Sequence, residues 1–421
     1  MECDTRARSP RTYTPPSTPT KRSHSKSSSV SSSSIREELD KLRKGISPTT
    51  ASTMEGTEKL SSSELRQFPL WQSDYEIDVD AAGVQKVIGQ GAWSTVYAAS
   101  PVSSMPSGFS APPPSSMHTS SEMTPPLTPV QSRGPSISGS LSVPKLDPSQ
   151  SPSYAIKVPY EKTAHRVLTE EGRILSYLSR FPSAEKYIVP YYGQDSRTAA
   201  LVMGFIPSNL ESLVLTDLNT REESDRAAML ADIFPHIACN LLDGLAWLQD
   251  KSCVHGDIKP ANILINTNPS TRTPHAVYAD FSASILPSTS NEKKPKAPIG
   301  GATWDFMAPS QLTASGANAP PTLESDLWAL AMTILILING ASPYERVAPN
   351  QILKREILKQ GTPLAYVSAG ENGVRNVLRM GALSRALGFN VKKWLGKVLV
   401  RDEAARMSIG EWREELADAL M

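Results

Sequence analysis

The fold of this chain is decided by residues 255–266, which read HGDIKPANILIN. Asp257 and Asn262 lie five positions apart in this stretch, and an apolar run follows Asn262. A carboxylate and an amide oxygen on one tight loop can orient an attacking hydroxyl group and hold a metal ion on phosphate oxygens. Lys259, two positions after Asp257, can offset charge on a transferred phosphoryl group. For this stretch alone, the alternative interpretation is a strand-edge loop that turns at an asparagine.

Composition limits what surrounds this loop. The 421 residues suffice for one large domain with tails or for two smaller domains. An apolar fraction of 39% and a count of 35 prolines indicate a folded part diluted by disordered stretches. The formal net charge of +1 gives no reason to expect a nucleic acid or an acidic membrane as a partner.

Targeting and redox signals are weak. Cys3, Cys239 and Cys253 are too scattered to indicate a disulfide framework or a zinc site, so a reducing compartment is expected. The first residues lack the apolar core of a signal peptide. The longest apolar run, residues 327–338, is too short to span a bilayer. We expect a soluble intracellular protein, cytoplasmic or nuclear, without a membrane span.

Residues 1–73 are rich in Ser, Thr, Pro and basic residues, which predicts a disordered tail. Its Ser-Pro and Thr-Pro pairs, at residues 9, 14, 18 and 47, could accept phosphate from a proline-directed kinase, or could be ordinary features of such a tail. Residues 34–45 combine a capping-box pattern with apolar residues at helical spacing. They predict a transient helix or docking segment, with solvated disorder as the alternative.

A glycine-containing loop follows at residues 88–98, IGQGAWSTVYA. The pattern G-x-G-x-x-G is incomplete, because Ser94 takes the third glycine position. Alternating apolar residues before the loop and Val96 after it predict a strand-loop-strand unit, not the strand-loop-helix of a dinucleotide site.

Residues 99–153 interrupt the strand pattern with twelve prolines and many serines. We interpret them as a disordered insert between two strands, because the entropy of loop closure grows only logarithmically with loop length. The insert repeats the Ser-Pro and Thr-Pro signature of the tail and could regulate the glycine loop beside it, or have no effect.

Strand and helix patterns resume after the insert. Residues 154–158, YAIKV, predict a strand that carries Lys157, and residues 162–179 predict a helix. Glu170 and Glu171 both lie on that helix, and periodicity does not choose between them. A strand is predicted at residues 201–206, LVMGFI, and a long helix before His255.

Four further stretches complete the series. They are YADFS at residues 278–282, ATWDFMAPS at 302–310, ESDLWAL at 324–330 and RDEAAR at 401–406. Taken in order over about residues 75–417, the motifs resemble those of the eukaryotic protein kinase superfamily, serine/threonine type. In that comparison residues 257, 280 and 310 belong to the sequences HGD, DFS and APS, which stand where relatives have HRD, DFG and APE.

The resemblance implies an α+β fold over residues 74–418. A small antiparallel-sheet lobe with one main helix would precede a larger, mostly helical lobe. Residues 280–310 would form the activation segment. Nothing in the sequence indicates a homo-oligomer, so a monomer is expected.

The resemblance also implies roles. Asp257 would orient the accepting hydroxyl, with Lys259 balancing charge and Thr303 bonding both. Lys157 would contact the nucleotide phosphates, held by Glu171, which the family pattern E-x-x-I-L favours over Glu170. Asn262 and Asp280 would hold Mg²⁺. The implied nucleotide contacts are Ile88, Gly89, Gly91, Ser94, Val96, Ala155, Lys157, Met203, Phe205, Ile206 and Leu264.

The implied function is transfer of the γ-phosphoryl group of ATP to Ser or Thr hydroxyls of a protein substrate. Gly256 removes the arginine that pairs with a phosphorylated activation loop in relatives, so such phosphorylation is not expected to be the on-switch. Ser310 leaves Arg406 without its usual glutamate partner. These departures keep open the alternative of a pseudokinase that binds nucleotide as a scaffold or allosteric partner. A phosphotransferase acting on a small molecule is a third interpretation.

Overall fold

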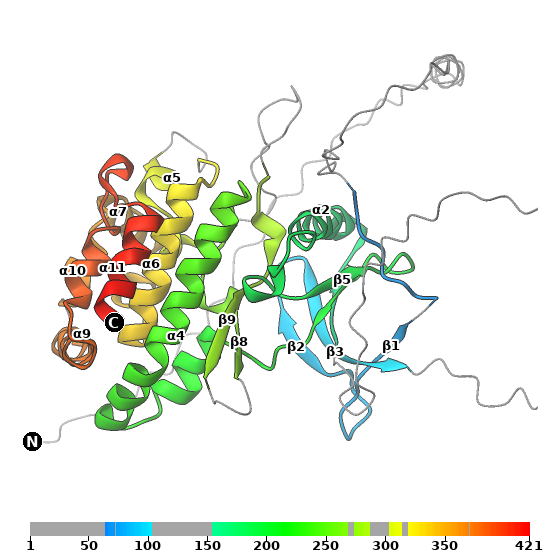
Figure 1. Ribbon diagram of the computed structural model, residues 1–421, viewed down its shortest axis with the longest axis horizontal. Helices are drawn as coiled ribbons and strands as arrows, with labels where there is room; N and C mark the ends of the chain where they lie inside the picture. Colours follow the sequence, from blue (N-terminus) through cyan, green and yellow to red (C-terminus); the bar gives the residue numbers. More distant parts are fainter. Residues whose placement is uncertain are drawn as a thin grey trace, which may run out of the picture. The chain divides into compact units, whose positions relative to one another are not determined.

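The computed structural model describes residues 64–71, 73–102, 154–267, 273–286, 303–313, 319–369 and 371–421 (Figure 1). All of them belong to one compact unit. The predicted helix at 34–45, the Ser-Pro and Thr-Pro pairs of the tail and insert, and residues 287–302 of the predicted activation segment lie outside the described residues. The predictions made for those stretches stay predictions.

The amino-terminal part is a six-stranded sheet in which every pairing is antiparallel. Its order is β1-β3-β4-β6-β5, with β2 paired to β3. The strands are β1 (Asp74–Ile77), β2 (Val87–Gln90), β3 (Ser94–Val102), β4 (Tyr154–Pro159), β5 (Tyr191–Gln194) and β6 (Leu201–Gly204). The resumption of strand structure at residue 154 is as the sequence predicts, and β3 reaches four residues further than the expected insert boundary.

Strand β4 divides two apolar layers because successive side chains point to opposite faces of a sheet. Tyr154 and Ile156 join a small cluster on one face. Ala155, on the other face, belongs to the main core together with the buried side of helix α2 (Lys162–Leu178). Leu168 and Leu175 of α2 are fully buried there. The sheet and helix therefore present Lys157 on the α2 side.

Residues 64–71 differ from the expectation of a tail that ends at residue 73. Phe68 is 6% exposed and lies edge-on to Tyr154, with ring centroids 6.0 Å apart. The Phe68 amide donates to Gln194 O at 2.9 Å, and the Arg66 amide donates to Ser176 Oγ at 2.8 Å. The four large apolar residues of this short segment, Leu65, Phe68, Leu70 and Trp71, do not alternate as in a strand, so the sequence pattern did not separate the segment from the tail.

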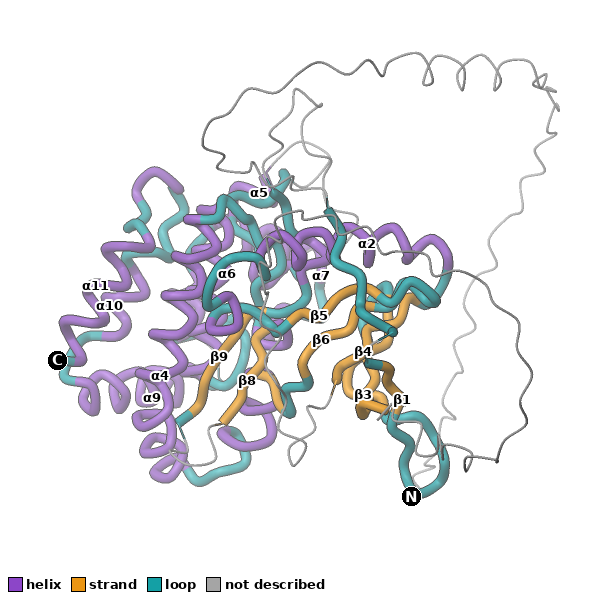
Figure 2. Tube along the Cα trace, turned by 45° about the vertical axis from the view of Figure 1, so that its right-hand side comes forward, coloured by secondary structure: helices purple, strands orange, loops and turns teal. Residues whose placement is uncertain are grey.

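The carboxyl-terminal part is mostly helical and follows a short crossing segment after Gly204. Its helices are α3 (Leu210–Ser212), α4 (Glu223–Asp250), α5 (Pro309–Thr313), α6 (Leu323–Asn339), α7 (Gln351–Gln360), α8 (Pro363–Val367), α9 (Gly373–Leu387), α10 (Val391–Gly396) and α11 (Ile409–Leu420). A second sheet runs β7-β8-β9, with β7 (Ser208–Asn209), β8 (Ile263–Thr267) and β9 (Pro274–Tyr278). Figure 2 shows β8 and β9 beside α4.

Helix α6 is the centre of this part. Every residue from Ser325 to Asn339 is buried, as expected for a helix that is apolar on all sides. A capping box between Thr322 and Ser325 begins the helix, and Gly340, with φ +85°, ends it. Helices α4 and α9 pack against it. The predicted α+β fold, with a small sheet lobe and a helical lobe, is confirmed.

No described helix is both long enough and apolar enough to cross a membrane.

Candidate active site

The loop before β8 is held to the buried amino-terminal end of α6. The carboxylate of Asp326 accepts the His255 amide at 2.6 Å through Oδ2 and the Gly256 amide at 2.9 Å through Oδ1. Burial raises the pKa of Asp326 to about 7, although both N–H groups favour the charged form. One carboxylate from the core helix thus fixes the loop that carries Asp257.

The local packing explains why position 256 holds a glycine where relatives have an arginine. The φ of Gly256 is +82°, and a Cβ atom there would lie 2.4 Å from the carbonyl oxygen of Ala283. Two hydrogen bonds also join the residues before Gly256 to those after Ala283. The Val254 amide donates to the Ile285 main-chain oxygen at 2.9 Å, and the Ile285 amide donates to the Val254 main-chain oxygen at 2.8 Å. The absence of a side chain at position 256 lets the loop lie directly against the segment that follows Asp280.

The structure brings Asp257, Lys259, Asn262 and Thr303 together. Lys259 Nζ lies 2.7 Å from Asp257 Oδ2 and donates to Thr303 Oγ1 at 3.1 Å. The Thr303 amide donates to Asp257 Oδ1 at 3.3 Å. Asn262 Nδ2 donates to the Asp257 main-chain oxygen at 2.8 Å and to Oδ2 at 3.0 Å. Both carboxylate oxygens of Asp257 are therefore oriented by neighbours.

A second charged cluster forms around Lys157. Its Nζ lies 2.8 Å from both Glu171 oxygens and 2.8 Å from Asp280 Oδ1. The structure thus selects Glu171, which is 1% exposed, whereas Glu170 is exposed and pairs with Arg173. Strand β4, helix α2 and the segment after β9 each contribute one member of the cluster.

The pKa values in this cluster follow from burial and pairing. Burial disfavours the charged form of Lys157, but the carboxylates of Asp280 and Glu171 outweigh it and raise its pKa. Burial raises the pKa of Glu171 to about 6, against the opposing effect of Lys157. Burial also opposes ionisation of Asp280, yet the ammonium group of Lys157 holds the pKa of that carboxyl well below its usual range.

Residues of the DFS motif contact both the Lys157 cluster and the loop that carries Asp257. Asp280 has φ +62°, an uncommon value for a residue other than glycine. Phe281 is fully buried, its ring centroid lies 4.8 Å from that of His255, and its amide donates to Glu171 Oε1 at 3.2 Å. Ser282 has a negative φ, so this conformation does not need the glycine that relatives have there.

The residues expected to contact nucleotide lie on the strands that frame this cluster. Cross-strand pairs Val96–Lys157 and Ala155–Met203 place those four side chains on one face of the sheet. The remaining members lie at the edges of the same region. Ile88 and Gly89 are on β2, Phe205 and Ile206 follow β6, and Leu264 is on β8. The Gly91 amide closes the turn by donating a hydrogen bond to the Ser94 main-chain oxygen at 2.9 Å.

The donor groups of Asn262 and Asp280 fit a magnesium ion. Because Asn262 Nδ2 is held by Asp257, the amide oxygen is turned away from that carboxylate. The Ala279 amide donates to the Asn262 main-chain oxygen at 2.9 Å, which ties the two candidate ligands together. Carboxylate and amide oxygens are ligands that Mg²⁺ accepts beside phosphate. Asn262 and Asp280 would hold it here.

Arg406 pairs with the carboxylate of Glu403, not with a residue at position 310. Its Nη1 donates to Glu403 Oε1 at 3.3 Å, and the same oxygen accepts a hydrogen bond from Ser310 Oγ. The guanidinium also lies over Trp328, 5.0 Å from the ring centroid. Glu403 therefore links Ser310 to Arg406. The sequence analysis missed Glu403, because nothing in its spacing shows that the start of α5 lies nearby.

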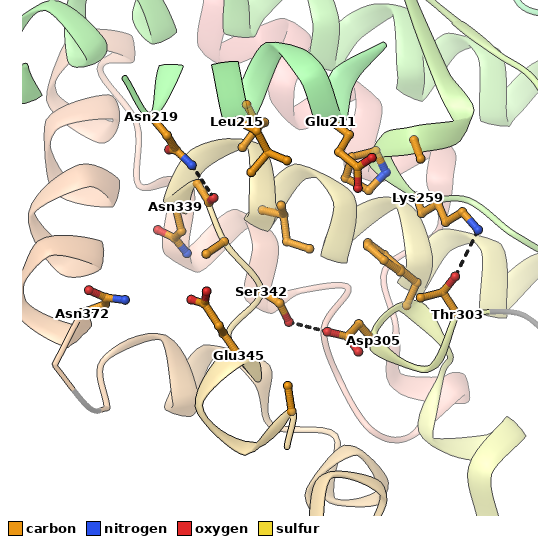
Figure 3. Close-up of a pocket in the computed structure, with 18 of the residues that line it drawn as sticks. Glu211, Leu215, Asn219, Lys259, Thr303, Asp305, Asn339, Ser342, Glu345 and Asn372 are labelled. Carbon is orange, nitrogen blue, oxygen red and sulfur yellow. Dashed lines mark hydrogen bonds between the residues drawn. The ribbon is translucent and has the colours of Figure 1, made fainter. Parts of the chain in front are cut away.

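A pocket of about 730 Å³ opens next to Lys259 and Thr303 and was not foreseen from the sequence (Figure 3). We call it the Asn339 pocket, after the last residue of α6, which lines it with Glu211, Ile336 and Glu345. The sequence did not predict this pocket, because a polar residue such as Asn339 after a long apolar run indicates only that a helix ends there.

Comparison with known proteins agrees with this geometry. The model of the protein kinase domain matches residues 146–416, more than half of the chain. The chain therefore belongs to the protein kinase family, and the superfamily expected from the sequence is confirmed.

Individual relatives are similar at a modest level. The chain is 30% identical over 169 residues to MAP kinase kinase MKK1/SSP32 of Saccharomyces cerevisiae, covering 39% of this chain and 30% of that protein. It is 28% identical over 200 residues to serine/threonine-protein kinase ISR1 of Eremothecium gossypii, covering 46% and 54%. For serine/threonine-protein kinase PkaB of Streptomyces coelicolor the values are 28% over 174 residues, 40% and 38%. The chain thus spans between about a third and about half of the length of these relatives.

Proposed function

We propose that this protein is an ATP-dependent protein serine/threonine kinase. The observation that carries the proposal is that one site holds both charged clusters, Lys157–Glu171–Asp280 and Asp257–Lys259–Thr303, with their hydrogen bonds formed. A scaffold protein that no longer transfers phosphate would have no need to keep the carboxylates of Asp257 and Asp280 oriented. Two of these relatives, PkaB and ISR1, are named serine/threonine-protein kinases, which supports the choice of acceptor.

In the proposed reaction the oxygen of a substrate hydroxyl forms a bond to the γ-phosphorus of ATP, and the bond to the β,γ-bridging oxygen breaks, releasing ADP. Asp257 accepts the hydroxyl hydrogen bond and takes the proton as the transfer completes. Lys259 and Thr303 hold the Asp257 carboxylate and offset the charge beside it. Lys157, oriented by Glu171, donates to phosphate oxygens of the nucleotide. Mg²⁺, when bound, supplies positive charge to the phosphates.

The test is transfer from γ-³²P-labelled ATP with Mg²⁺, to the purified protein itself and to a generic basic protein. We expect label on Ser or Thr, lost in the Asp280→Ala variant. Asp257→Asn should reduce turnover by about 10²–10⁴-fold while nucleotide binding persists, because it removes only the group that accepts the proton. Wild-type turnover in Asp257→Asn would refute the role of Asp257. No transfer by the wild type, with Mg²⁺-ATP binding retained, would favour the pseudokinase.

A further inference from the structure

Residues 64–71 form a segment, which we call the strap, that lies before the part of the chain matched by the protein kinase model. The match begins at residue 146, so membership of the family assigns the strap no role. The reaction proposed above does not use it either. In Figure 1 the strap, in blue, runs beside one end of α2.

On one side the strap pairs with the outer edge of β5, which is the last strand of the sheet. The Gln194 amide donates to the Arg66 main-chain oxygen at 2.9 Å, and the Phe68 amide donates to the Gln194 main-chain oxygen at 2.9 Å. Gln67 and Gln194 thus form a parallel bridge. The Arg66 guanidinium adds a hydrogen bond to the Tyr191 main-chain oxygen at 3.1 Å. These bonds occupy main-chain groups that an edge strand otherwise leaves unpaired.

On the other side the strap contacts α2 at the residue directly after Glu171. A Cβ atom on Gly172 would lie 2.9 Å from Leu65 Cδ1, so the Leu65 side chain packs against the main chain of α2 at that point. One turn further on, the Arg66 amide donates to Ser176 Oγ at 2.8 Å, and Ser176 Oγ donates to the Gly172 main-chain oxygen at 2.6 Å. The strap therefore contacts α2 on two successive turns.

The elements that the strap joins carry the two members of one ion pair. Glu171 lies on α2 and Lys157 on β4 of the sheet, and Lys157 Nζ is 2.8 Å from both Glu171 oxygens. Hydrogen bonds to a nitrogen donor rarely exceed about 3.2 Å, so a shift of α2 by about 1 Å would break this contact. A segment bonded to both the sheet and α2 opposes such a shift.

We propose that the strap positions Glu171, with Leu65 and the Arg66 main chain holding α2 at the distance from the sheet at which Glu171 reaches Lys157. Leu65 and Arg66 are positioning residues, because they act through α2 and are not among the implied nucleotide contacts. The effect on turnover rests on the proposed kinase function. The effect on the place of Glu171 does not.

The first readout is hydrogen exchange of the full-length protein without ligand, followed by mass spectrometry. The Phe281 amide donates to Glu171 Oε1 at 3.2 Å, so its exchange reports whether Glu171 stays in place. In Leu65→Ala we expect exchange in α2 and at Phe281 to speed up about threefold or more, because local opening follows the loss of local packing. Ser176→Ala, which removes the acceptor of the Arg66 amide, should act in the same direction.

Two further variants separate positioning from general stability. Leu65→Met keeps a large apolar side chain and should restore wild-type exchange. Val202→Ala truncates a fully buried residue of the same sheet, in the small cluster on the face opposite α2. It should lower the melting temperature without a selective increase of exchange in α2 and at Phe281.

The second readout is the rate of transfer at varied ATP concentration, measured below the melting temperatures of all variants. If the strap acts through Glu171, removing Glu171 removes its effect. We expect Leu65→Ala to lower kcat/KM for ATP about fivefold or more in the wild type, and less than about 1.5-fold when added to Glu171→Gln. Independent effects would multiply.

The two readouts keep the two proposals apart. Exchange in Leu65→Ala that is unchanged, or that rises in α2 no more than in Val202→Ala, would overturn the inference whatever the rates show. Effects of Leu65→Ala and Glu171→Gln that multiply would also overturn it. The expected rise in exchange in a protein that transfers no phosphate would support the place of the strap and overturn the proposed function alone.

Discussion

At the scale of single residues, Gly256 shows how a departure from a family motif can be required by packing. A residue with a Cβ atom there would meet both an unfavourable φ and the Ala283 carbonyl oxygen. We expect Gly256→Ala to lower the free energy of unfolding by about 2–4 kcal/mol, from the positive φ and from overpacking together.

The control is Gly388→Ala, at the carboxyl-terminal end of α9. Gly388 also has a positive φ, +73°, but no atom lies within 4 Å of the position of its Cβ. It should lose only about 1–2 kcal/mol. Urea unfolding of both variants measures the difference, and equal losses would mean that the Ala283 contact has no effect at position 256.

Asp326 gives the protein a pH dependence with a definite sign. Its pKa rises on folding from an ordinary value of 3.8 to about 7, so the folded state binds the proton more strongly. The stabilisation is fully present below pH 4 and is lost as pH rises through about 7. We expect the free energy of unfolding to decline between pH 5 and 7.5, and Asp326→Asn to flatten that decline.

The measurement is urea unfolding at several pH values, compared as slopes, because the substitution also changes one loop hydrogen bond and shifts absolute stability. Glu171, whose pKa rises to about 6, leaves a smaller slope of the same sign in the variant. Identical slopes in the two proteins would exclude Asp326 as the titrating group.

At the scale of elements, the Glu403 link joins the start of α5 to the segment before α11. Glu403→Ala should lower the free energy of unfolding by about 1–2 kcal/mol, less than for a fully buried pair, because the Glu403 side chain is 32% exposed. Adding Ser310→Glu to that variant should restore stability, since Ser310 and Arg406 contact the same Glu403 oxygen. Thermal unfolding that shows no recovery in the double variant would mean that a carboxylate at position 310 does not reach Arg406.

The elements also show what the sequence could and could not predict. Asp257, Lys259 and Asn262 lie on one loop, so their spacing along the chain nearly determines their spacing in space. The contact of Lys157 with Glu171 was expected because a known order of strand and helix relates them. Glu403 and Asn339 could not be found this way. The surroundings of these two side chains depend on how helices pack, and the sequence of α6 is apolar throughout without showing which side of the helix lines a pocket.

At the scale of the whole molecule, the packing of residues 64–71 decides which shortened chains keep their stability. Phe68 fills the small cluster against Tyr154 and Ile156. A chain that begins at Ser73 should lose about 3–5 kcal/mol, the usual effect of emptying a buried phenylalanine site. A chain that begins at Glu64 should retain wild-type stability.

Phe68→Ala in the full chain controls for the loss of the other residues, and differential scanning calorimetry of all three proteins makes the comparison. If the chain from Ser73 melts with the wild type, the packing of Phe68 does not contribute to stability.

The Lys157 cluster has a consequence for the kinds of small molecule that this protein admits. An ammonium group has three hydrogens, and all three are engaged, two by Glu171 and one by Asp280. An anionic ligand that binds Lys157 must therefore displace Asp280. One ion pair replaces another, so the ligand gains little electrostatic binding energy. A neutral heterocycle that lies between Val96 and Leu264 makes no such exchange. Inhibitor screens against the resting protein should accordingly favour uncharged compounds, and their affinities should depend little on magnesium concentration.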